Sequence, residues 1–139
     1  MVITLLSDFG DVYPASMKGV ILSINPAANI VDISHSVSPH DIRAGAFILM
    51  ITARYFPSNT VHIAVVDPGV GTKRRALAIR AESESGIHYL IGPDNGLLIP
   101  AAKSLGDFKV YEITNTNLFQ KNISSTFHGR DIFAPVGAH

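Results

Sequence analysis

Short apolar runs alternate along this chain with segments in which apolar residues recur at helical spacing. The runs are typical of strands, and the run at 61–66, interrupted only by His62, is apolar enough for the centre of a sheet. Strands that alternate with helices predict an α/β fold with a mostly parallel sheet flanked by helices. The expected strands are residues 2–6, 30–33, 61–66, 77–81, 88–91 and 108–113, with a hairpin-like loop between the fourth and the fifth.

Prolines and polar residues mark the ends of the expected helices. Pro14 suits the first turn of one helix, and Asn25-Pro26 ends it. Ser38 is expected to cap a second helix, with Pro39 in its first position and Pro57 at its end. Two shorter helices are expected, one through Ala101 and Leu105 and a last one opening at residues 126–131, after a polar loop at 115–125.

The composition changes the picture of the surface. The 139 residues are 47% hydrophobic and only 16% charged, whereas an average domain has about 25% charged residues. Part of the apolar surface is therefore expected to be covered by another subunit or by a missing domain. Residues 1–139 suggest one domain, and the last helix has barely begun where they end, which favours a truncated amino-terminal domain.

Charge and cysteine content exclude several classes of protein. Eleven basic residues balance 11 acidic ones without a basic run, so nucleic acid is a poor candidate partner. The chain has no cysteine, which excludes disulfides and thiolate metal sites. It starts with a strand rather than a signal peptide, and no apolar stretch is long enough to cross a membrane. We therefore expect a cytoplasmic protein without membrane contact.

Polar turns follow several of the expected strands, and in open α/β sheets ligands bind at the carboxyl ends of strands. Asp8 follows the first strand and Asp11 comes three residues later. These carboxylates could simply cap the next helix. Alternatively, Asp8 could accept hydrogen bonds from both hydroxyls of a ribose, and a second carboxylate could hold an ammonium group.

Asp67 follows the most apolar strand, where a desolvated carboxylate needs a partner or a function. Arg74 and Arg75 come shortly afterwards, and because adjacent side chains point in different directions, only one of them is expected to turn inward. The glycines around Asp67 match neither a dinucleotide fingerprint nor a phosphate-binding loop.

His128 opens the last polar cluster. A histidine at a helix start is more often structural than catalytic, and the neighbouring Arg130 and Asp131 could form an ordinary surface pair. The 6 histidines lack metal-ligand spacing, so we expect no metal.

These turns match one protein family in order and spacing. The matching segments are Ser7-Asp8-Phe9-Gly10, Met17-Lys18-Gly19, and residues 31–35, 65–72, 92–98 and 126–131. On these segments the chain resembles the S-adenosyl-L-methionine hydroxide adenosyltransferases, which are adenosine-forming hydrolases related to fluorinase and chlorinase. Halogenases of this kind carry Tyr in place of Asp67 and Ser in place of Gly129, so the resemblance favours water over halide as the nucleophile.

The resemblance implies an activity and a set of site residues. An Asp-Arg-His set, here Asp67, Arg74 and His128, would activate a water that attacks the ribose C5′ of S-adenosylmethionine, giving adenosine and methionine without a cofactor. Asp8 corresponds to the ribose-binding aspartate. Asp11 lies near the position that holds the methionine end, and Asn95, in the matching turn 92–98, is a further substrate-binding candidate.

The resemblance also implies an assembly. Family members form homotrimers whose sites lie between this domain and a neighbour's carboxyl-terminal β-barrel, and no such barrel follows in this sequence. The alternative is therefore a truncated, inactive domain that binds nucleosides or serves in assembly. A hydrolase of phosphate esters that uses Asp67 and His128 is a third reading, which no phosphate loop supports.

Overall fold

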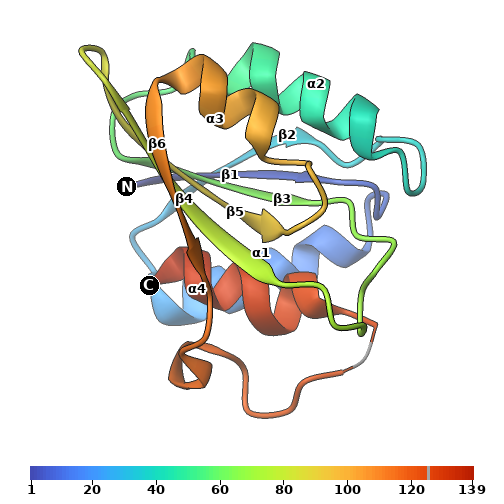
Figure 1. The fold of residues 1–139 in the computed structure, drawn as a ribbon. Coiled ribbons are helices and arrows are strands. Elements are labelled where there is room, and N and C mark those ends of the chain that lie inside the picture. Colours follow the sequence, from blue (N-terminus) through green and yellow to red (C-terminus); the bar gives the residue numbers. More distant parts are fainter. Residues whose placement is uncertain (125) are drawn as a thin grey trace.

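The computed structural model describes residues 1–124 and 126–139 and contains one sheet with the strand order β2-β1-β3-β5-β4-β6 (Figure 1). The strands are β1 (Val2–Ser7), β2 (Asn29–Ser34), β3 (Thr60–Val65), β4 (Ala76–Ser83), β5 (Gly86–Pro93) and β6 (Asp107–Glu112). The helices are α1 (Tyr13–Ile24), α2 (Ile42–Ala53), α3 (Ile99–Leu105) and α4 (Ala134–Ala138), with a 3₁₀ turn η1 (Thr116–Leu118) and a π-helical turn η2 (Gly129–Phe133). The predicted α/β fold is confirmed.

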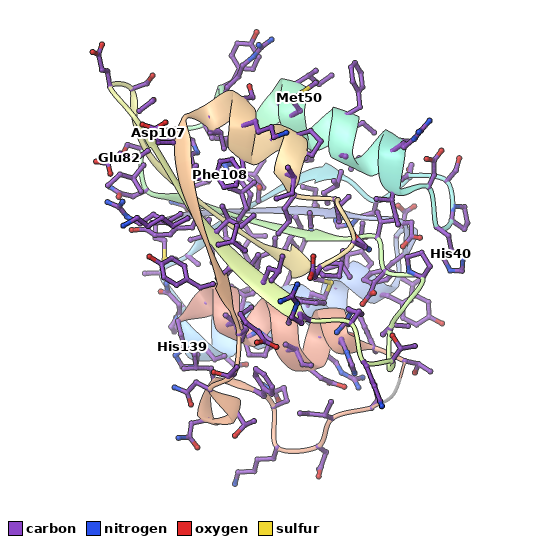
Figure 2. The ribbon with its side chains drawn as sticks, in the orientation of Figure 1. His40, Met50, Glu82, Asp107, Phe108 and His139 are labelled. Carbon is purple, nitrogen blue, oxygen red and sulfur yellow. The ribbon has the colours of Figure 1, made fainter. Side chains whose placement is uncertain are left out.

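The sheet is mixed, because only part of it is parallel. Strands β2, β1, β3 and β5 run parallel, whereas β4 is antiparallel to both β5 and β6. The predicted hairpin explains the change of direction: a short loop suffices for antiparallel neighbours, while parallel neighbours need a longer crossover. In Figure 2, Glu82 and Asp107 lie together at one end of the β4–β6 pair, where they are register partners.

Helices cover both faces of the sheet (Figure 1). Helices α2 and α3 lie on one face, over a core that includes Leu6, Leu49 and Leu90. Helices α1 and α4 lie on the other face, over a core that includes Ile3 and Phe133. Because β3 lies in the interior with both faces covered, all six of its residues are buried, as its apolar run predicts.

Helix α2 starts later than predicted. Its cap is Asp41, whose side chain accepts a hydrogen bond from the backbone N–H of Ala44 at 3.0 Å. The prediction of a Ser38 cap is wrong because His40 adopts a φ of 64°, in the left-handed region, which a right-handed helix cannot include. The start of α1 near Pro14 and its end at Asn25 are confirmed.

Gly92 is a position at which a side chain has no room. A Cβ there would lie 2.4 Å from the backbone carbonyl oxygen of Ala64, which cannot rotate away. We therefore expect Gly92→Ala to lower the free energy of unfolding by about 1–3 kcal/mol. Gly19→Ala, in the middle of α1 with nothing within 4 Å of its Cβ, is the matched control and should raise stability by about 0.5–1 kcal/mol. Urea unfolding of both variants checks this, and equal effects would contradict it.

Candidate active site

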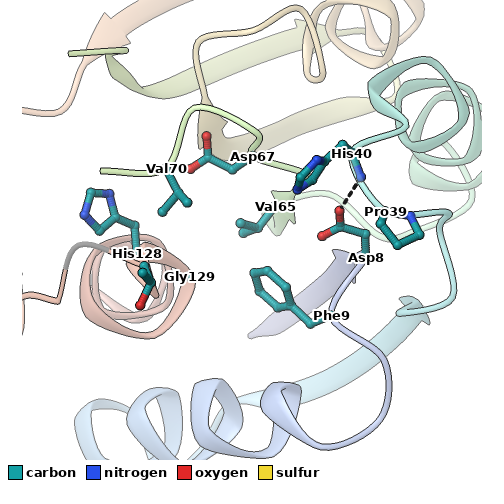
Figure 3. Close-up of a pocket in the computed structure, with 10 residues that line it drawn as sticks. Asp8, Phe9, Pro39, His40, Val65, Asp67, Val70, His128 and Gly129 are labelled. Carbon is teal, nitrogen blue, oxygen red and sulfur yellow. Dashed lines mark hydrogen bonds between the residues drawn. The ribbon is translucent and has the colours of Figure 1, made fainter. Parts of the chain in front are cut away.

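One cavity gathers polar side chains from segments that lie far apart in the sequence (Figure 3). It has a volume of about 250 Å³ and opens where β1 and β3 end. Ser7 and Val65, the last residues of these strands, are register partners, so the loops that follow them start side by side. The cavity is lined by Asp8, Phe9, Pro39, His40, Val65, Asp67, Val70, Thr126, His128 and Gly129.

Asp67 is held by a forked ion pair with Arg74. The Arg74 Nε donates to Asp67 Oδ1 at 3.0 Å and to Oδ2 at 3.1 Å, and Nη2 donates to Oδ2. The Asp67 side chain is 3% exposed and that of Arg74 12%. Such a fork fixes the orientation of a carboxylate as well as its position. The ring of Phe133 supports the guanidinium, 5.3 Å from its centroid.

The loop between Asp67 and Arg74 brings the two side chains together. It contains two tight backbone hydrogen bonds, from Val70 N–H to Asp67 and from Thr72 N–H to Gly69. The neighbouring Arg75 is 62% exposed and pairs with Asp94 instead. The prediction that one of these two arginines turns inward is confirmed, and the structure identifies it as Arg74.

His128 completes this set. Its Nδ1 lies 2.9 Å from Arg74 Nη2. Because a guanidinium only donates, Nδ1 must be the acceptor, and the proton of the neutral imidazole then sits on Nε2. Burial and the neighbouring charge of Arg74 lower the pKa of His128, partly opposed by the charge of Asp67. The imidazole is therefore neutral at pH 7.

Asp8 lines the same cavity, on the side of Pro39 and His40 (Figure 3). Its Oδ2 accepts the backbone N–H of His40 at 2.7 Å. From the sequence, His40 was expected within a helix start and without metal-ligand spacing, and its place in this wall was missed. No local pattern signals this place, because the left-handed φ of 64° at His40 depends on the surrounding fold.

Two further candidates lie elsewhere. Asp11 is exposed and does not line the cavity. Asn95 uses both ends of its amide within the turn after β5: Nδ2 donates to the Val66 carbonyl at 2.8 Å, and Oδ1 accepts the Leu97 N–H at 3.1 Å. Asn95 therefore holds the backbone immediately before Asp67. A direct role of either residue in binding stays a prediction.

Asp131 pairs with Arg130 and also holds neighbouring backbone. Arg130 Nε donates to Asp131 Oδ1 at 2.8 Å, but the Asp131 side chain is only 2% exposed. Its Oδ2 also accepts the Ser124 N–H at 2.8 Å, and its backbone carbonyl accepts the Gln120 N–H at 2.9 Å. The reading as an ordinary surface pair is therefore wrong: Asp131 anchors residues 120–124 beside the turn that carries His128.

Two other kinds of site are absent from the part of the chain that the structure describes. In residues 1–124 and 126–139, no group of three or more His, Cys, Asp or Glu side chains is arranged to hold a metal ion. Within the same residues, no helix is both long and apolar enough to cross a membrane.

Comparisons with known proteins agree on one family. The chain is 47% identical over 139 residues to the (R)-S-adenosyl-L-methionine hydrolase of Salinispora arenicola, a match that covers 98% of this chain and 51% of that protein. It is 32% identical over 159 residues to the fluorinase of an Actinoplanes species, covering 99% of this chain and 53% of that one. The chain thus spans about half the length of the curated relatives it matches.

The fold agrees with these sequence matches. It is similar to the crystal structure of an uncharacterized conserved protein from Thermotoga maritima, with a TM-score of 0.92 and 44% identity over 100% of this chain and 53% of that one. Residues 3–139 match the family model described as SAM hydroxide adenosyltransferase N-terminal domain. The chain therefore belongs to the SAM hydroxide adenosyltransferase family, whose N-terminal domain it matches from residue 3 to residue 139.

Proposed function

We propose that the protein hydrolyses S-adenosyl-L-methionine to adenosine and L-methionine through attack of water on the ribose C5′. The observation that carries this proposal is the buried Asp67 carboxylate, which Arg74 holds while it also contacts His128, in a cavity that Asp8 lines as well. The relatives named hydrolase and fluorinase support chemistry of this class. Asp67 stands where the resemblance implies water-activating chemistry rather than a halide pocket.

The chemistry needs an activated and aligned water. The oxygen–C5′ bond forms while the C5′–sulfur bond breaks, and the bond's electron pair stays on sulfur, which leaves as neutral methionine. A sulfonium needs no acid to leave. Asp67 has lone pairs beyond those facing Arg74 and accepts the water proton, a contribution of about 10²–10⁴-fold. Alignment of water, C5′ and sulfur adds up to about 7–11 kcal/mol.

In this proposal Arg74 is a positioning residue. Its fork prevents the Asp67 carboxylate from rotating, and its Nη2 ties His128 to the same unit. Asp8 grips the ribose diol from the other part of the cavity, so that C5′ is presented toward Asp67. S-adenosylmethionine acts as the substrate, and the proposal needs no cofactor.

The cavity of about 250 Å³ lies below the roughly 300–1,000 Å³ of a usual small-molecule site. We therefore propose that further contacts, those to the adenine among them, come from outside this chain. The resemblance implies that these contacts come from the carboxyl-terminal domain of a neighbouring subunit in a homotrimer. We propose that this homotrimer is cytoplasmic and has no nucleic-acid partner.

Hydrolysis in ¹⁸O-labelled water tests the proposed function. The complete product of the gene should convert S-adenosylmethionine to methionine and to adenosine that carries the label at its 5′-hydroxyl. Formation of a halogenated nucleoside alone, or no turnover with Asp67 intact, would overturn the proposal. Calorimetry of residues 1–139 with adenosine then tests the alternative of a nucleoside-binding domain that is inactive alone.

The rate of hydrolysis is expected to fall as the pH decreases through the pKa of His128. Because burial and Arg74 lower this pKa from 6.5, the imidazole becomes charged only below about pH 6.5. A protonated His128 cannot accept the hydrogen bond from Arg74, and its positive charge repels the guanidinium. We expect kcat/KM to show an acid limb that is absent from His128→Asn, which does not titrate. An unchanged limb in that variant would assign it to another group.

A further inference from the structure

A series of side-chain hydrogen bonds leads from the surface to the loop that carries Asp8. On β2, Asp32 accepts from Lys18 through Oδ2 and lies 2.8 Å from His35 Nε2 through Oδ1. The other ring nitrogen of His35, Nδ1, lies 2.6 Å from Ser7 Oγ at the end of β1. We refer to Ser7, His35 and Asp32 as the relay. Its inner end is the residue directly before Asp8.

The chemistry of the partners determines which atoms donate. Burial raises the pKa of Asp32, but hydrogen bonds from Lys18 and His35 outweigh it and hold this pKa below its usual value. As a carboxylate, Asp32 only accepts, so His35 Nε2 carries the proton. When Nε2 carries the only ring proton, Nδ1 accepts from the Ser7 hydroxyl. The Ser7 oxygen in turn accepts the backbone N–H of Phe9 at 3.3 Å.

Ser, His and Asp in this order also build nucleophilic triads, but this one does not present a nucleophile. Ser7 is 0% exposed, and its hydroxyl is held between His35 and the Phe9 backbone. It is also absent from the residues that line the cavity, whereas Asp8 and Phe9 are among them. The relay therefore acts on the loop rather than on a substrate.

His35 fastens that loop on both sides of Asp8. Its ring holds Ser7, and its backbone carbonyl accepts the N–H of Gly10 at 2.9 Å. Phe9, between these two attachments, packs against Gly129, where an added Cβ would lie 3.0 Å from Phe9 Cε2. The loop is thus held at Ser7 and Gly10 by His35 and at Phe9 by Gly129. Loss of the His35 ring removes the attachment directly before Asp8 and lets the Asp8 carboxylate change its orientation.

We propose that the relay is a positioning device that holds Asp8 in the orientation needed to accept both hydroxyls of a ribose. The inference rests on the proposed function, because it assumes that Asp8 grips the diol. His35 and Asp32 are positioning residues in this scheme and do not touch the substrate. Their loss should weaken binding only for ligands that possess the diol.

Calorimetry with adenosine and with 2′,3′-dideoxyadenosine, which lacks the diol, tests the relay in the complete product of the gene. We expect His35→Leu to raise the Kd for adenosine about tenfold or more, the effect of losing one hydrogen bond to a charged group. The Kd for the dideoxy analogue should stay within about twofold. His35→Asn keeps an acceptor for Ser7 and should recover part of the adenosine affinity.

Two more variants separate this effect from a loss of stability. Asp32→Asn, at the partly exposed end, should show the same selectivity for the diol even if His35→Leu folds poorly. Glu82→Gln breaks the exposed pair with Arg80 on β4 and should leave both Kd values unchanged. Equal losses for the two nucleosides, or none in His35→Leu and Asp32→Asn, would overturn the relay. A wild-type protein that does not prefer adenosine would instead overturn the ribose assignment of Asp8.

Discussion

Replacing Asp67 with asparagine is expected to lower the turnover of S-adenosylmethionine by about 10²–10⁴-fold, the usual contribution of a general base. The amide cannot take up the water proton. It also turns a donor toward Arg74, which itself only donates, so the fork of hydrogen bonds at 3.0 and 3.1 Å breaks on one side. The loss should appear mainly in kcat, because the ribose contacts that we propose for Asp8 would remain.

Asp94→Asn is the matched control for this variant. Asp94 also pairs with an arginine, Arg75, but that pair is largely exposed, with 62% of the Arg75 side chain accessible. We expect its turnover to stay within about twofold of the wild-type value, since exposed ion pairs contribute little. Steady-state kinetics of Asp67→Asn and Asp94→Asn, each compared with the wild type, tests this prediction. If Asp67→Asn retains more than a tenth of the wild-type kcat, Asp67 is not the base.

His62 is expected to make the fold sensitive to acid. It is 0% exposed on β3, with Nδ1 2.7 Å from Thr4 Oγ1 and Nε2 3.0 Å from His88 Nδ1. Burial, and then the charge of His88, lower the pKa of His62 from 6.5 to about 3. Between these two pH values the unfolded chain binds a proton that the folded chain rejects. Stability is thus present above pH 6.5 and is lost as the pH falls.

The size of this effect follows from the shift. Each pKa unit corresponds to about 1.4 kcal/mol, so the free energy of unfolding should fall by about 1.4 kcal/mol per pH unit below pH 6.5 through this residue alone. The total approaches about 5 kcal/mol near pH 3, a large part of the roughly 5–15 kcal/mol of a typical domain.

Urea unfolding at pH 7, 5.5 and 4.5 measures this slope. In His62→Gln, which does not titrate, the decrease between pH 5.5 and 4.5 should be smaller than in the wild type by about 1.4 kcal/mol. His139→Gln, which replaces an exposed histidine, should keep the wild-type slope. Equal slopes in the wild type and in His62→Gln would show that the buried imidazole does not control acid stability.

Local patterns predicted most of the elements. Apolar runs identified each strand to within a few residues, and Pro14, Asn25 and the 126–131 motif marked real helix boundaries or came within three residues of them. Asp8 and Asp67 were expected at strand ends, where they lie. These features depend on periodicity and on the backbone preferences of single residues, which a short segment expresses by itself.

Other features depend on which distant segments meet. Adjacent Arg74 and Arg75 are equivalent as sequence, and only the turn after Asp67 directs the first inward. The left-handed conformation of His40 displaced the predicted cap from Ser38 to Asp41. The relay joins Ser7 to His35, 28 residues away, because β1 and β2 lie side by side, and no pattern within either strand shows this.

By itself, the sequence of this protein determined an α/β alternation, carboxylates at strand ends and the motifs that resemble one family. The tertiary structure decided that β4 lies between β5 and β6 and pairs antiparallel with both. It also decided that Asp67, Arg74 and His128 form one connected unit, and that Asn95 and Asp131 hold backbone nearby. The physical reason is range. Periodicity and propensity act over a few residues, whereas an ion pair or a shared cavity depends on the topology that brings remote side chains within about 3 Å.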